Sequence, residues 1–455
     1  MCGLWRHMSQ DRKLDPTDTI FALSSAPGRA GVAVFRVSGP GAARVVERVA
    51  GTLPSPRRAS LRRLRGEAGT LDRALVLWMP GPGTFTGEDV AEIMPHGSRA
   101  VTEALAGALL AAGARQARPG EFVRRAFANG KMDLLEAEGL ADLIDSETEA
   151  QRVQALRQME GGLSARAGGW KTALLDALAP IEGEIDFPDE QDVPDRLSRE
   201  AGPILDALRE ELDRTLGEFG RGERVREGLR VAVIGAPNSG KSSFINSLAG
   251  RDVAIVTDIP GTTRDVVEVQ LDLCGLPVRV ADTAGLREAA DRVEREGVRR
   301  ARDAAQDADL RVLMVDAADP KPDGVEALMP GDVLVVNKSD VVSDCPALPF
   351  AWDDEPLMVS VRDGSGVSEL VATLEREVVA RFAPTRDPGL TRARHRDCVQ
   401  RARDAIVCAR AQLDAAPELA ADELRQALRA LDELAGRADM DAVLDRVFSR
   451  FCIGK

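Results

Sequence analysis

A glycine-rich run that contains one lysine is the strongest chemical signal in this sequence of 455 residues. The run covers residues 235–242 (GAPNSGKS) and matches the pattern G-x-x-x-x-G-K-[ST]. It follows an apolar run at 229–234 and leads into a helical pattern, which is the context that a phosphate-binding loop requires. Backbone N–H groups of such a loop surround phosphate oxygens, and the helix dipole adds a favourable field. We therefore expect Lys241 to neutralise charge on the β- and γ-phosphates of a nucleotide, and the Ser242 hydroxyl to bind Mg²⁺.

Three shorter motifs follow this run in the order that is typical of a GTP-binding domain. Asp282 opens the run DTAG after an apolar stretch, where its carboxylate can hold Mg²⁺ through a water molecule. Asn337 opens the run NKSD, and the carboxylate of Asp340 can accept two hydrogen bonds from N1 and N2 of guanine. Adenine offers no such pair of donors, so this motif predicts GTP rather than ATP. Residues 360–362 would support the base, and residues 261–265 (GTTRD) occupy the position of the first switch.

The catalytic part of this pattern departs from the Ras-type arrangement at two points. Leu286 follows DTAG, where a glutamine would orient the attacking water. The sequence also shows no clear arginine finger, although Arg264 is a candidate. The amide oxygen of Asn238 and the carbonyl and threonine oxygens of residues 254–262 could instead hold a monovalent cation that balances the developing charge. Asn238 could equally support a turn, and the residues alone leave these two interpretations open.

The elements that must position these motifs form an α/β block between two helical blocks. Residues 229–382 alternate apolar strand-like runs with helical patterns, which predicts a mostly parallel sheet with crossover helices. The expected strands are 229–234, 278–281, 310–315, 333–336 and 357–361. Helical periodicity covers residues 129–223 and 390–451, and residues 19–118 combine short strand-like runs with one Ala-rich helix.

This arrangement predicts a multidomain α/β protein. We infer that a P-loop, Ras-like G domain is inserted into one discontinuous helical domain, because the ends of a domain often lie close together. An N-terminal α+β domain precedes both. The predicted boundaries are a leader at 1–17, the N-terminal domain at 18–129, helical segments at 130–224 and 384–455, and the G domain at 225–383.

Composition restricts the class of protein further. Apolar residues make up 44% of the chain and charged residues 29%, which is typical of a globular protein with a core. The net charge of −14 and the aromatic content of 4% argue against a protein that coats nucleic acid. The six cysteines form no CxxC pair, and we find neither a signal peptide nor a membrane span, so we expect a cytoplasmic location. An arginine-rich run at 57–65 could contact RNA, but a solvated loop is the interpretation that we favour.

Several longer runs of the chain resemble the MnmE (TrmE) family of tRNA modification GTPases. The resemblance covers nearly all of the chain after residue 17. The matching runs are PGRAGV at 27–32, FTGEDV at 85–90, PGEF at 119–122, IDFPDE at 185–190, IVTD at 255–258 leading into GTTRD, and FCIGK at 451–455. The run from Thr257 to Asp265 and the C-terminal run are together its most specific parts.

For the G domain, the resemblance implies GTP hydrolysis that K⁺ stimulates and that dimerisation of two G domains assembles. The implied K⁺ ligands are Asn238, Thr257, Ile259 and Thr262, and the implied Mg²⁺ ligands are Ser242 and Thr263. Glu294 matches the position that activates water through a bridging water, although without the resemblance it would be an ordinary acid on a helix. The full set of expected GTP-binding residues is Asn238, Ser239, Gly240, Lys241, Ser242, Ser243, Thr257, Asp258, Ile259, Pro260, Gly261, Thr262, Thr263, Asp282, Thr283, Ala284, Gly285, Asn337, Lys338, Asp340, Ser360, Val361 and Arg362.

For the N-terminal domain, the resemblance implies a constitutive homodimer that binds a folate, either 5-formyltetrahydrofolate or methylenetetrahydrofolate. The matching residues are Arg36, Glu92, Lys131 and Lys455. A carboxylate such as Glu92 can pair with the amide and amine face of a pterin, and a cationic side chain suits the glutamate tail. Cys452 matches a catalytic cysteine that the modification requires in the family. Without the resemblance, these positions would be surface charges and a packed cysteine.

Two hypotheses for the function follow. The resemblance implies a GTPase that acts with a FAD-containing partner, MnmG (also called GidA), as a heterotetramer on tRNA. The pair would add a carboxymethylaminomethyl group at C5 of the wobble uridine, with folate as one-carbon donor. The alternative is a GTP-controlled switch in RNA or ribosome assembly, of the Era type. Such proteins carry an RNA-binding domain after the G domain and lack the folate-like region, so folate binding would separate the two hypotheses.

Overall fold

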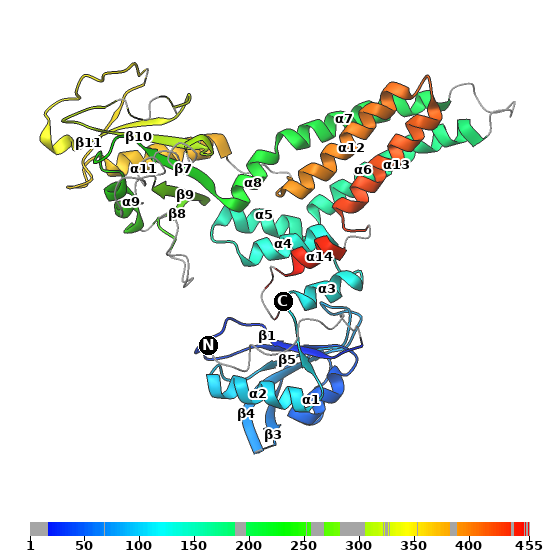
Figure 1. The fold of residues 1–455 in the computed structure, drawn as a ribbon. Coiled ribbons are helices and arrows are strands. Elements are labelled where there is room, and N and C mark those ends of the chain that lie inside the picture. The colour runs from blue at the N-terminus through cyan, green and yellow to red at the C-terminus, as the bar shows by residue number, and fades with distance from the viewer. Residues whose placement is uncertain are drawn as a thin grey trace, which may run out of the picture. The chain divides into compact units, whose positions relative to one another are not determined.

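The structure is a computed structural model of the chain. It describes residues 17–67, 69–186, 197–251, 253–255, 268–282, 305–321, 323, 326, 328–352, 354–382, 389–437, 441–449, 451 and 454. The chain divides into two compact units, of which the first contains the residues up to Glu138 and from Ala435 onward, and the second contains Gly139–Leu434. Figure 1 shows both units, with many of their helices and strands labelled. Over the ranges described, no helix combines the length and the hydropathy that a bilayer crossing needs.

The first unit is built on a six-stranded sheet in the order β3-β4-β5-β2-β1-β6. Its strands are β1 (Ile20–Leu23), β2 (Phe35–Ser38), β3 (Ser60–Gly66), β4 (Gly69–Met79), β5 (Val90–Met94) and β6 (Arg115–Gln116). Neighbouring strands are antiparallel except β1 and β6, which are parallel. Helices α1 (Ala42–Ala50) and α2 (Arg99–Ala111) share a buried core with alternate side chains of the sheet, such as Phe35, Val37 and Val76. The predicted α+β domain is therefore confirmed.

The arginine-rich run at 57–65 is mostly a strand, and the solvated loop predicted for it is wrong from Ser60 onward. The residues from Ser60 belong to β3, which pairs with β4 along its length and has a register shift between Leu64 and Arg65. The side chain of Leu64 is completely buried in the core of the unit. Pairing with a long apolar strand and burial of one side chain outweigh the low strand propensity of a charged run.

The last described residues of the chain also pack into the first unit. Helices α3 (Glu121–Ala128) and α14 (Asp441–Phe448) belong to this unit, and α4 (Leu134–Ile144) begins in it. The ring centre of Phe448 lies 6.1 Å from that of Phe127 and 6.3 Å from that of Phe451. Ser24 Oγ donates a hydrogen bond of 3.0 Å to the carbonyl oxygen of Gly454. These contacts hold the end of the chain beside β1.

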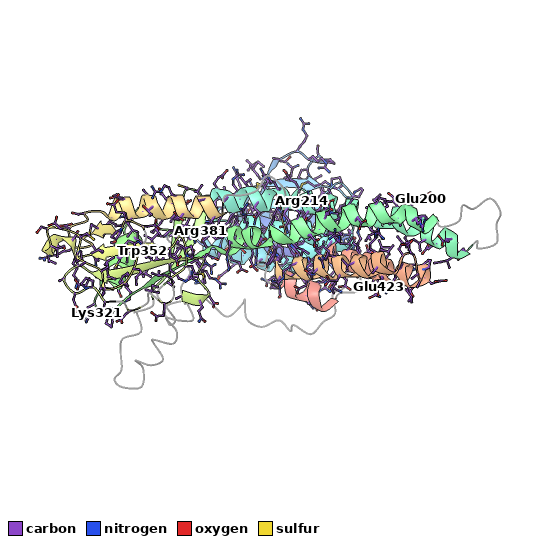
Figure 2. The ribbon with its side chains drawn as sticks, turned by 90° about the horizontal axis from the view of Figure 1, so that it is seen from above. Glu200, Arg214, Lys321, Trp352, Arg381 and Glu423 are labelled. Carbon is purple, nitrogen blue, oxygen red and sulfur yellow. The ribbon has the colours of Figure 1, made fainter. Side chains whose placement is uncertain are left out.

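Helices from both sides of the α/β domain form one helical domain in the second unit. The helices are α5 (Glu149–Met159), α6 (Gly162–Asp186), α7 (Ala201–Gly217), α8 (Phe219–Glu227), α12 (Ala393–Gln412) and α13 (Pro417–Leu434), with a 3₁₀ helix at Leu197–Glu200. Helices α6, α7, α12 and α13 pack along one another, and Figure 2 shows Glu200, Arg214 and Glu423 on this bundle. Lys171 of α6 forms an ion pair with Asp432 of α13 at 2.7 Å. The predicted discontinuous helical domain is confirmed, because α6 and α13 lie on opposite sides of the α/β domain in the sequence.

The α/β domain has a six-stranded sheet in the order β12-β11-β10-β7-β9-β8. Its strands are β7 (Leu229–Ile234), β8 (Glu268–Leu273), β9 (Leu276–Asp282), β10 (Leu310–Asp316), β11 (Val333–Asn337) and β12 (Leu357–Val359). Neighbours are parallel except β8 and β9, which form an antiparallel hairpin. Five of these strands overlap the five runs predicted from the sequence, so the mostly parallel sheet is confirmed.

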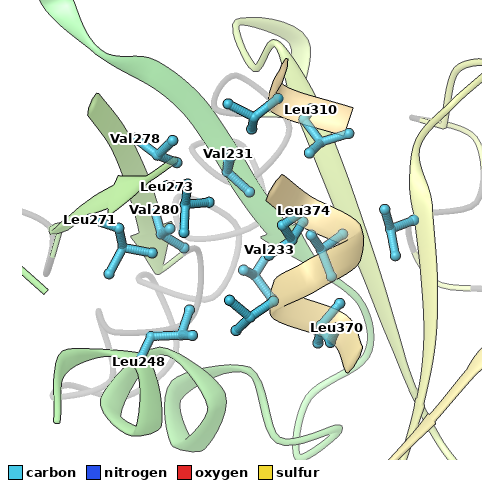
Figure 3. Close-up of a cluster of buried hydrophobic side chains, with 14 of the residues drawn as sticks. Val231, Val233, Leu248, Leu271, Leu273, Val278, Val280, Leu310, Leu370 and Leu374 are labelled. Carbon is cyan, nitrogen blue, oxygen red and sulfur yellow. The ribbon is translucent and has the colours of Figure 1, made fainter. Parts of the chain in front are cut away.

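Helices α9 (Lys241–Ala249) and α11 (Val367–Phe382) cover one face of this sheet. Figure 3 shows Leu248 of α9 and Leu370 and Leu374 of α11 beside the valines of β7 and β9. Side chains from the opposite face of the sheet, such as Ile234 and Leu313, belong to a second buried cluster. Burial on both faces explains why β10 is buried at every residue but its last, rather than at alternate residues.

Candidate functional site

Four motif-bearing segments meet at one edge of the sheet in the α/β domain. Strands β7, β10, β11 and β12 run parallel, so their carboxyl ends lie at the same edge, where α/β proteins bind ligands. The glycine-rich loop follows β7, the NKSD run begins at the last residue of β11, and residues 360–362 follow β12. Asp282 ends β9, which is parallel to β7. The fold therefore brings together motifs that the sequence separates by more than a hundred residues.

The glycine-rich loop passes so close to its neighbours that two positions exclude a side chain. Gly235 has a φ of 135°, and a Cβ there would lie 2.1 Å from the carbonyl oxygen of Met314. Gly240 has a φ of 103° and precedes α9, and its Cβ would lie 2.0 Å from Nδ2 of Asn337. Only glycine fits both the backbone conformation and the space at these positions.

The side chain of Lys241 folds back onto the glycine-rich loop. Its Nζ donates hydrogen bonds to the carbonyl oxygens of Gly235, at 2.9 Å, and Ala236, at 2.7 Å, and the residue is only 6% exposed. The hydroxyl of Ser239 is buried and has no hydrogen-bond partner within the described part of the chain. A phosphate in this loop would offer charged acceptors to these donors in place of carbonyls, which gives stronger hydrogen bonds. Ser242 lies in the first turn of α9, and the backbone N–H groups of a first helical turn are suited to bind an anion.

The expected base-binding segments are tied to one another and to the glycine-rich loop by side-chain hydrogen bonds. Asn337 Nδ2 donates to the carbonyl oxygen of Ser239 at 2.8 Å, and the backbone N–H of Val361 donates to Asn337 Oδ1 at 3.2 Å. Ser360 Oγ donates to Asp340 Oδ1 at 2.8 Å. Asn337 thus sets the spacing between phosphate and base segments, and Ser360 orients the carboxylate that would pair with guanine.

Lys338 has a partner that the sequence did not suggest. It adopts a φ of 65°, and its Nζ donates to Asp316 Oδ2 at 2.5 Å. Burial acts to raise the pKa of Asp316, but hydrogen bonds from Lys338 and from the backbone of Ala318 hold this pKa below its usual value. The sequence signal for this contact was an acid at the end of β10. Strands β10 and β11 are adjacent and parallel, so Asp316 lies opposite Asn337, the first residue of the NKSD run. Arg362, in contrast, is 87% exposed and 3.9 Å from Asp340, so its ion pair contributes little.

A second group of predicted residues lies on the sheet of the first unit. Arg36 of β2 and Glu92 of β5 are cross-strand neighbours, and Arg36 Nη2 donates to Glu92 Oε1 at 2.9 Å. The guanidinium of Arg36 lies 5.4 Å from the ring centre of Phe85 and 5.9 Å from that of Phe122. Lys131 is exposed after α3. The structure therefore joins two of the predicted residues in one partly exposed ion pair beside two aromatic rings.

Comparison with known proteins decides the family. A family model described as the MnmE helical domain matches residues 134–452, and one described as the GTP-binding protein TrmE N-terminus matches residues 19–131. The tRNA modification GTPase MnmE of Maricaulis maris is 54% identical over 443 residues, which cover 96% of this chain and 99% of that protein. The tRNA modification GTPase MnmE of Phenylobacterium zucineum is 50% identical over 449 residues, which cover 96% of this chain and 100% of that protein. The chain belongs to the MnmE family of tRNA modification GTPases.

Membership in the MnmE family confirms the resemblance that the sequence runs indicated. Among solved structures, the G domain of the T. maritima FeoB iron transporter is 25% identical, with a TM-score of 0.25. The match covers 33% of this chain and 98% of that one. The family assignment therefore depends on the family models and on the nearly full-length MnmE relatives.

Several residues that the MnmE resemblance implies lie outside the described residues. They are Thr257, Asp258, Ile259, Pro260, Gly261, Thr262, Thr263, Thr283, Ala284, Gly285, Glu294, Cys452 and Lys455, together with the side chain of Asp282. Of the implied K⁺ ligands, Asn238 is described, and it adopts a φ of 67° in the glycine-rich loop. Among the side chains that the structure describes, no group of three or more His, Cys, Asp or Glu residues is placed to hold a metal ion. The K⁺ ligands, the Mg²⁺ ligands and the catalytic roles of Glu294 and Cys452 stay predictions.

The MnmE N-terminal region also contains a buried ionic network that sequence reasoning missed. Glu121, in the first turn of α3, is 2% exposed and accepts hydrogen bonds from Arg115 Nη2 at 2.6 Å and Arg125 Nη2 at 3.2 Å. Arg125 Nη1 also donates to Glu88 Oε1 at 3.0 Å. Burial acts to raise the pKa of Glu121, but hydrogen bonds from Arg115 and from the backbone of Arg118, with the charges of Arg115 and Arg125, hold this pKa below its usual value. The four-residue spacing of Glu121 and Arg125 was the signal for a helix-surface pair, but burial is not visible in that spacing.

Proposed function

We propose that this chain hydrolyses GTP in a K⁺-stimulated cycle that serves the modification of the wobble uridine of certain tRNAs. The observation that carries the proposal is the convergence of Lys241, Asn337 and Asp340 at one edge of the α/β sheet. Lys241 supplies the charge for the phosphates, and Asn337 links that loop to the base segment. Asp340, oriented by Ser360, supplies the acceptors for guanine. Membership in the MnmE family supports the tRNA part of the proposal.

The proposed hydrolysis uses two cations and one carboxylate. Mg²⁺ is held by Ser242 and Thr263, and K⁺ by Asn238, Thr257, Ile259 and Thr262, where it balances charge that develops between the β- and γ-phosphates. Glu294 activates the attacking water through a second water molecule. Dimerisation of two G domains completes the site. Asn238 adopts a φ of 67° in the glycine-rich loop, a left-handed conformation that asparagine tolerates in turns.

The proposed modification requires the N-terminal domain and a second protein. A folate binds near Arg36, Glu92, Lys131 and Lys455 in a homodimer and supplies one carbon, and the FAD-containing partner MnmG joins as a heterotetramer on tRNA. Cys452 takes part in the modification chemistry. The Arg36–Glu92 ion pair beside the partly exposed ring of Phe85 supports this site, since it offers both charges and an aromatic surface to a pterin. We place the reaction in the cytoplasm.

Steady-state GTP hydrolysis by the full chain in KCl and in NaCl, at equal ionic strength, tests the proposal. We expect strong activation by K⁺ alone, and loss of this selectivity in Asn238→Gly. Glycine keeps the left-handed backbone at this position and removes the side chain together with its amide group. Cys274→Gly offers a matched control, because it makes the same kind of change at another left-handed residue, in the turn between β8 and β9 and outside the proposed nucleotide site. Equal rates of the wild-type chain in both salts would contradict the proposed K⁺ site and leave the family assignment unchanged.

A further inference from the structure

An arginine-rich face on the hairpin of β3 and β4 has no role in the proposed GTP cycle. Between residues 57 and 79 the sequence contains six arginines and two acidic residues, whereas the whole chain has a formal net charge of −14. Positive charge is therefore concentrated in this segment of a chain whose net charge is negative. Such a concentration is the usual electrostatic mark of a polyanion-binding surface.

The strand geometry places three of these arginines on one exposed face. Along β3, Leu61, Arg63 and Arg65 are exposed, whereas the intervening Leu64 is buried in the core. The register puts Arg63 directly opposite Arg73 of β4, which is also exposed. Like charges directly opposite each other on a sheet destabilise it, so this pairing is unfavourable in the isolated protein.

The charge on this face is not neutralised within the described part of the protein. The side chains of Arg63, Arg65 and Arg73 make no hydrogen bond or ion pair with another described residue. The nearest acid on β4, Asp72, is occupied by His96, whose backbone N–H donates to it at 2.8 Å and whose Nδ1 lies 2.9 Å away. The three guanidinium groups are therefore available to an anionic partner.

We propose that this face, consisting of Arg63, Arg65 and Arg73, binds the phosphate backbone of an RNA. The inference rests on the proposed function in tRNA modification, which supplies RNA as the polyanion. Guanidinium groups match phosphate oxygens in charge and in planar, two-pronged geometry. Trp78 is the one aromatic residue between 57 and 79, and it is buried, so stacking on bases does not contribute. Binding through this face is therefore independent of base sequence and strongly dependent on salt.

A second explanation is that the arginines protect an edge of the sheet. β3 is the terminal strand of the sheet order, and charged side chains on such a strand oppose pairing with another chain. Edge protection predicts that removal of the arginines causes self-association and leaves RNA binding unchanged. The two explanations therefore differ in what the same variant does.

The test measures the affinity of the full chain for an unmodified tRNA transcript over a range of KCl concentrations. The variant R63Q/R65Q/R73Q is compared with a control variant, R44Q/R214Q/R429Q, which loses the same charge from exposed positions on α1, α7 and α13. We expect the slope of log affinity against log salt to be less steep by between about 2 and 3 in the hairpin variant only. The single variant Arg73→Gln, with a change of about 1, keeps the test valid if the triple variant folds poorly.

Two outcomes overturn the proposal. One is a hairpin variant whose slope equals that of the wild-type chain, and self-association of that variant would then favour edge protection. The other is a wild-type chain that does not bind the transcript. GTP hydrolysis, measured on the same samples, keeps the two proposals apart, because a chain that hydrolyses GTP and fails only in RNA binding contradicts the hairpin site alone.

Discussion

The two candidate ligand sites use their sheets in opposite ways. In the α/β domain, the contacting groups lie in short segments beyond the carboxyl ends of parallel strands, Lys241 at the start of α9 and Asp340 in a 3₁₀ turn after β11. In the N-terminal domain, Arg36 and Glu92 lie inside antiparallel strands and meet through the register of β2 and β5. A loop carries its chemistry in consecutive residues, whereas the cross-strand pair joins residues 56 positions apart. A site on consecutive residues is therefore visible as a sequence motif. A site formed across two strands is visible only once the pairing of the strands is known.

The two sites also differ in what holds them in place. The nucleotide loop depends on backbone conformation, since Gly235 and Gly240 take positive φ values that place them against Met314 and Asn337. The unit that contains the Arg36–Glu92 pair also contains a buried ionic network centred on Glu121. We therefore expect substitutions in the nucleotide loop to affect catalysis before stability, and substitutions in this network to affect stability first.

The largest expected effect is the loss of hydrolysis in Lys241→Ala. Removing one cation that stabilises transition-state charge lowers kcat by about 10²–10³-fold. Steady-state GTP hydrolysis measures the loss, and folate binding by the same variant measures whether the second site is independent. A kcat within tenfold of the wild-type value would contradict the role of Lys241, and a parallel loss of folate binding would contradict the separation of the two sites.

The next effect is the destabilisation of the N-terminal domain in Glu121→Gln. The substitution removes the buried charge that Arg115 and Arg125 share, although Asp18 and Glu88 remain as their outer partners. We expect a cost of about 3 kcal/mol in the free energy of unfolding. Hydrogen exchange of α3 in the full chain measures this cost, with Glu103→Gln as control, because Glu103 forms only an exposed pair with Arg99. Unchanged protection of α3 would show that the network contributes no stability.

The lowered pKa of Glu121 predicts how the stability of the N-terminal domain depends on pH. The pKa of Glu121 is lowered below its ordinary value of 4.5 in the folded protein, so its stabilisation is complete above that value and is lost as the pH falls through the folded pKa. We expect α3 protection in the wild-type chain to weaken below about pH 4.5, and that of Glu121→Gln to change less over this range. Parallel profiles for the two proteins would contradict the lowered pKa.

A smaller effect is expected for guanine recognition in Asp340→Asn. The substitution removes an acceptor of two hydrogen bonds and weakens GTP binding by about 100-fold, since two charged hydrogen bonds are worth about 3 kcal/mol. Ser360→Ala removes only the 2.8 Å bond that orients Asp340 and should weaken binding by about fivefold. Titration with a fluorescent GTP analogue measures both. Equal losses in the two variants would show that Ser360 does more than orient the carboxylate.

The smallest effect is expected at the strand site, in Glu92→Gln. The neutral amide keeps the shape of the side chain but loses the charge that pairs with Arg36, so 5-formyltetrahydrofolate binding should weaken by about tenfold. Isothermal titration measures the affinity, and GTP hydrolysis of the same variant should stay unchanged. An unchanged folate affinity would remove Glu92 from the proposed site, whereas a change in hydrolysis would link the two domains.

Much of the nucleotide site was predictable, and the reason is local. The strands around the site are continuous apolar runs, and the motifs follow them directly. The order of the motifs along the chain therefore indicated which would bind phosphate and which would bind the base. Asp316 escaped prediction because its contact with Lys338 depends on β10 lying beside β11. The family resemblance named Arg36 and Glu92, but no local pattern indicated that the two residues face each other.

The amino-acid sequence by itself determined the GTP-binding motifs, the alternation of strands and helices, and the insertion of one domain into another. These properties depend on periodicity and on short-range conformational preference, which consecutive residues carry. Only the tertiary structure decided that the arginine-rich run forms an edge strand, that Glu121 is buried between two arginines, and that Lys241 turns back onto its own loop. The hydrogen-bond partners of Glu121 and Lys241 lie only four to six positions away, but burial of these side chains depends on the fold around them. Burial changes the free energy of a charged side chain more than local propensity does, and the sequence does not show it.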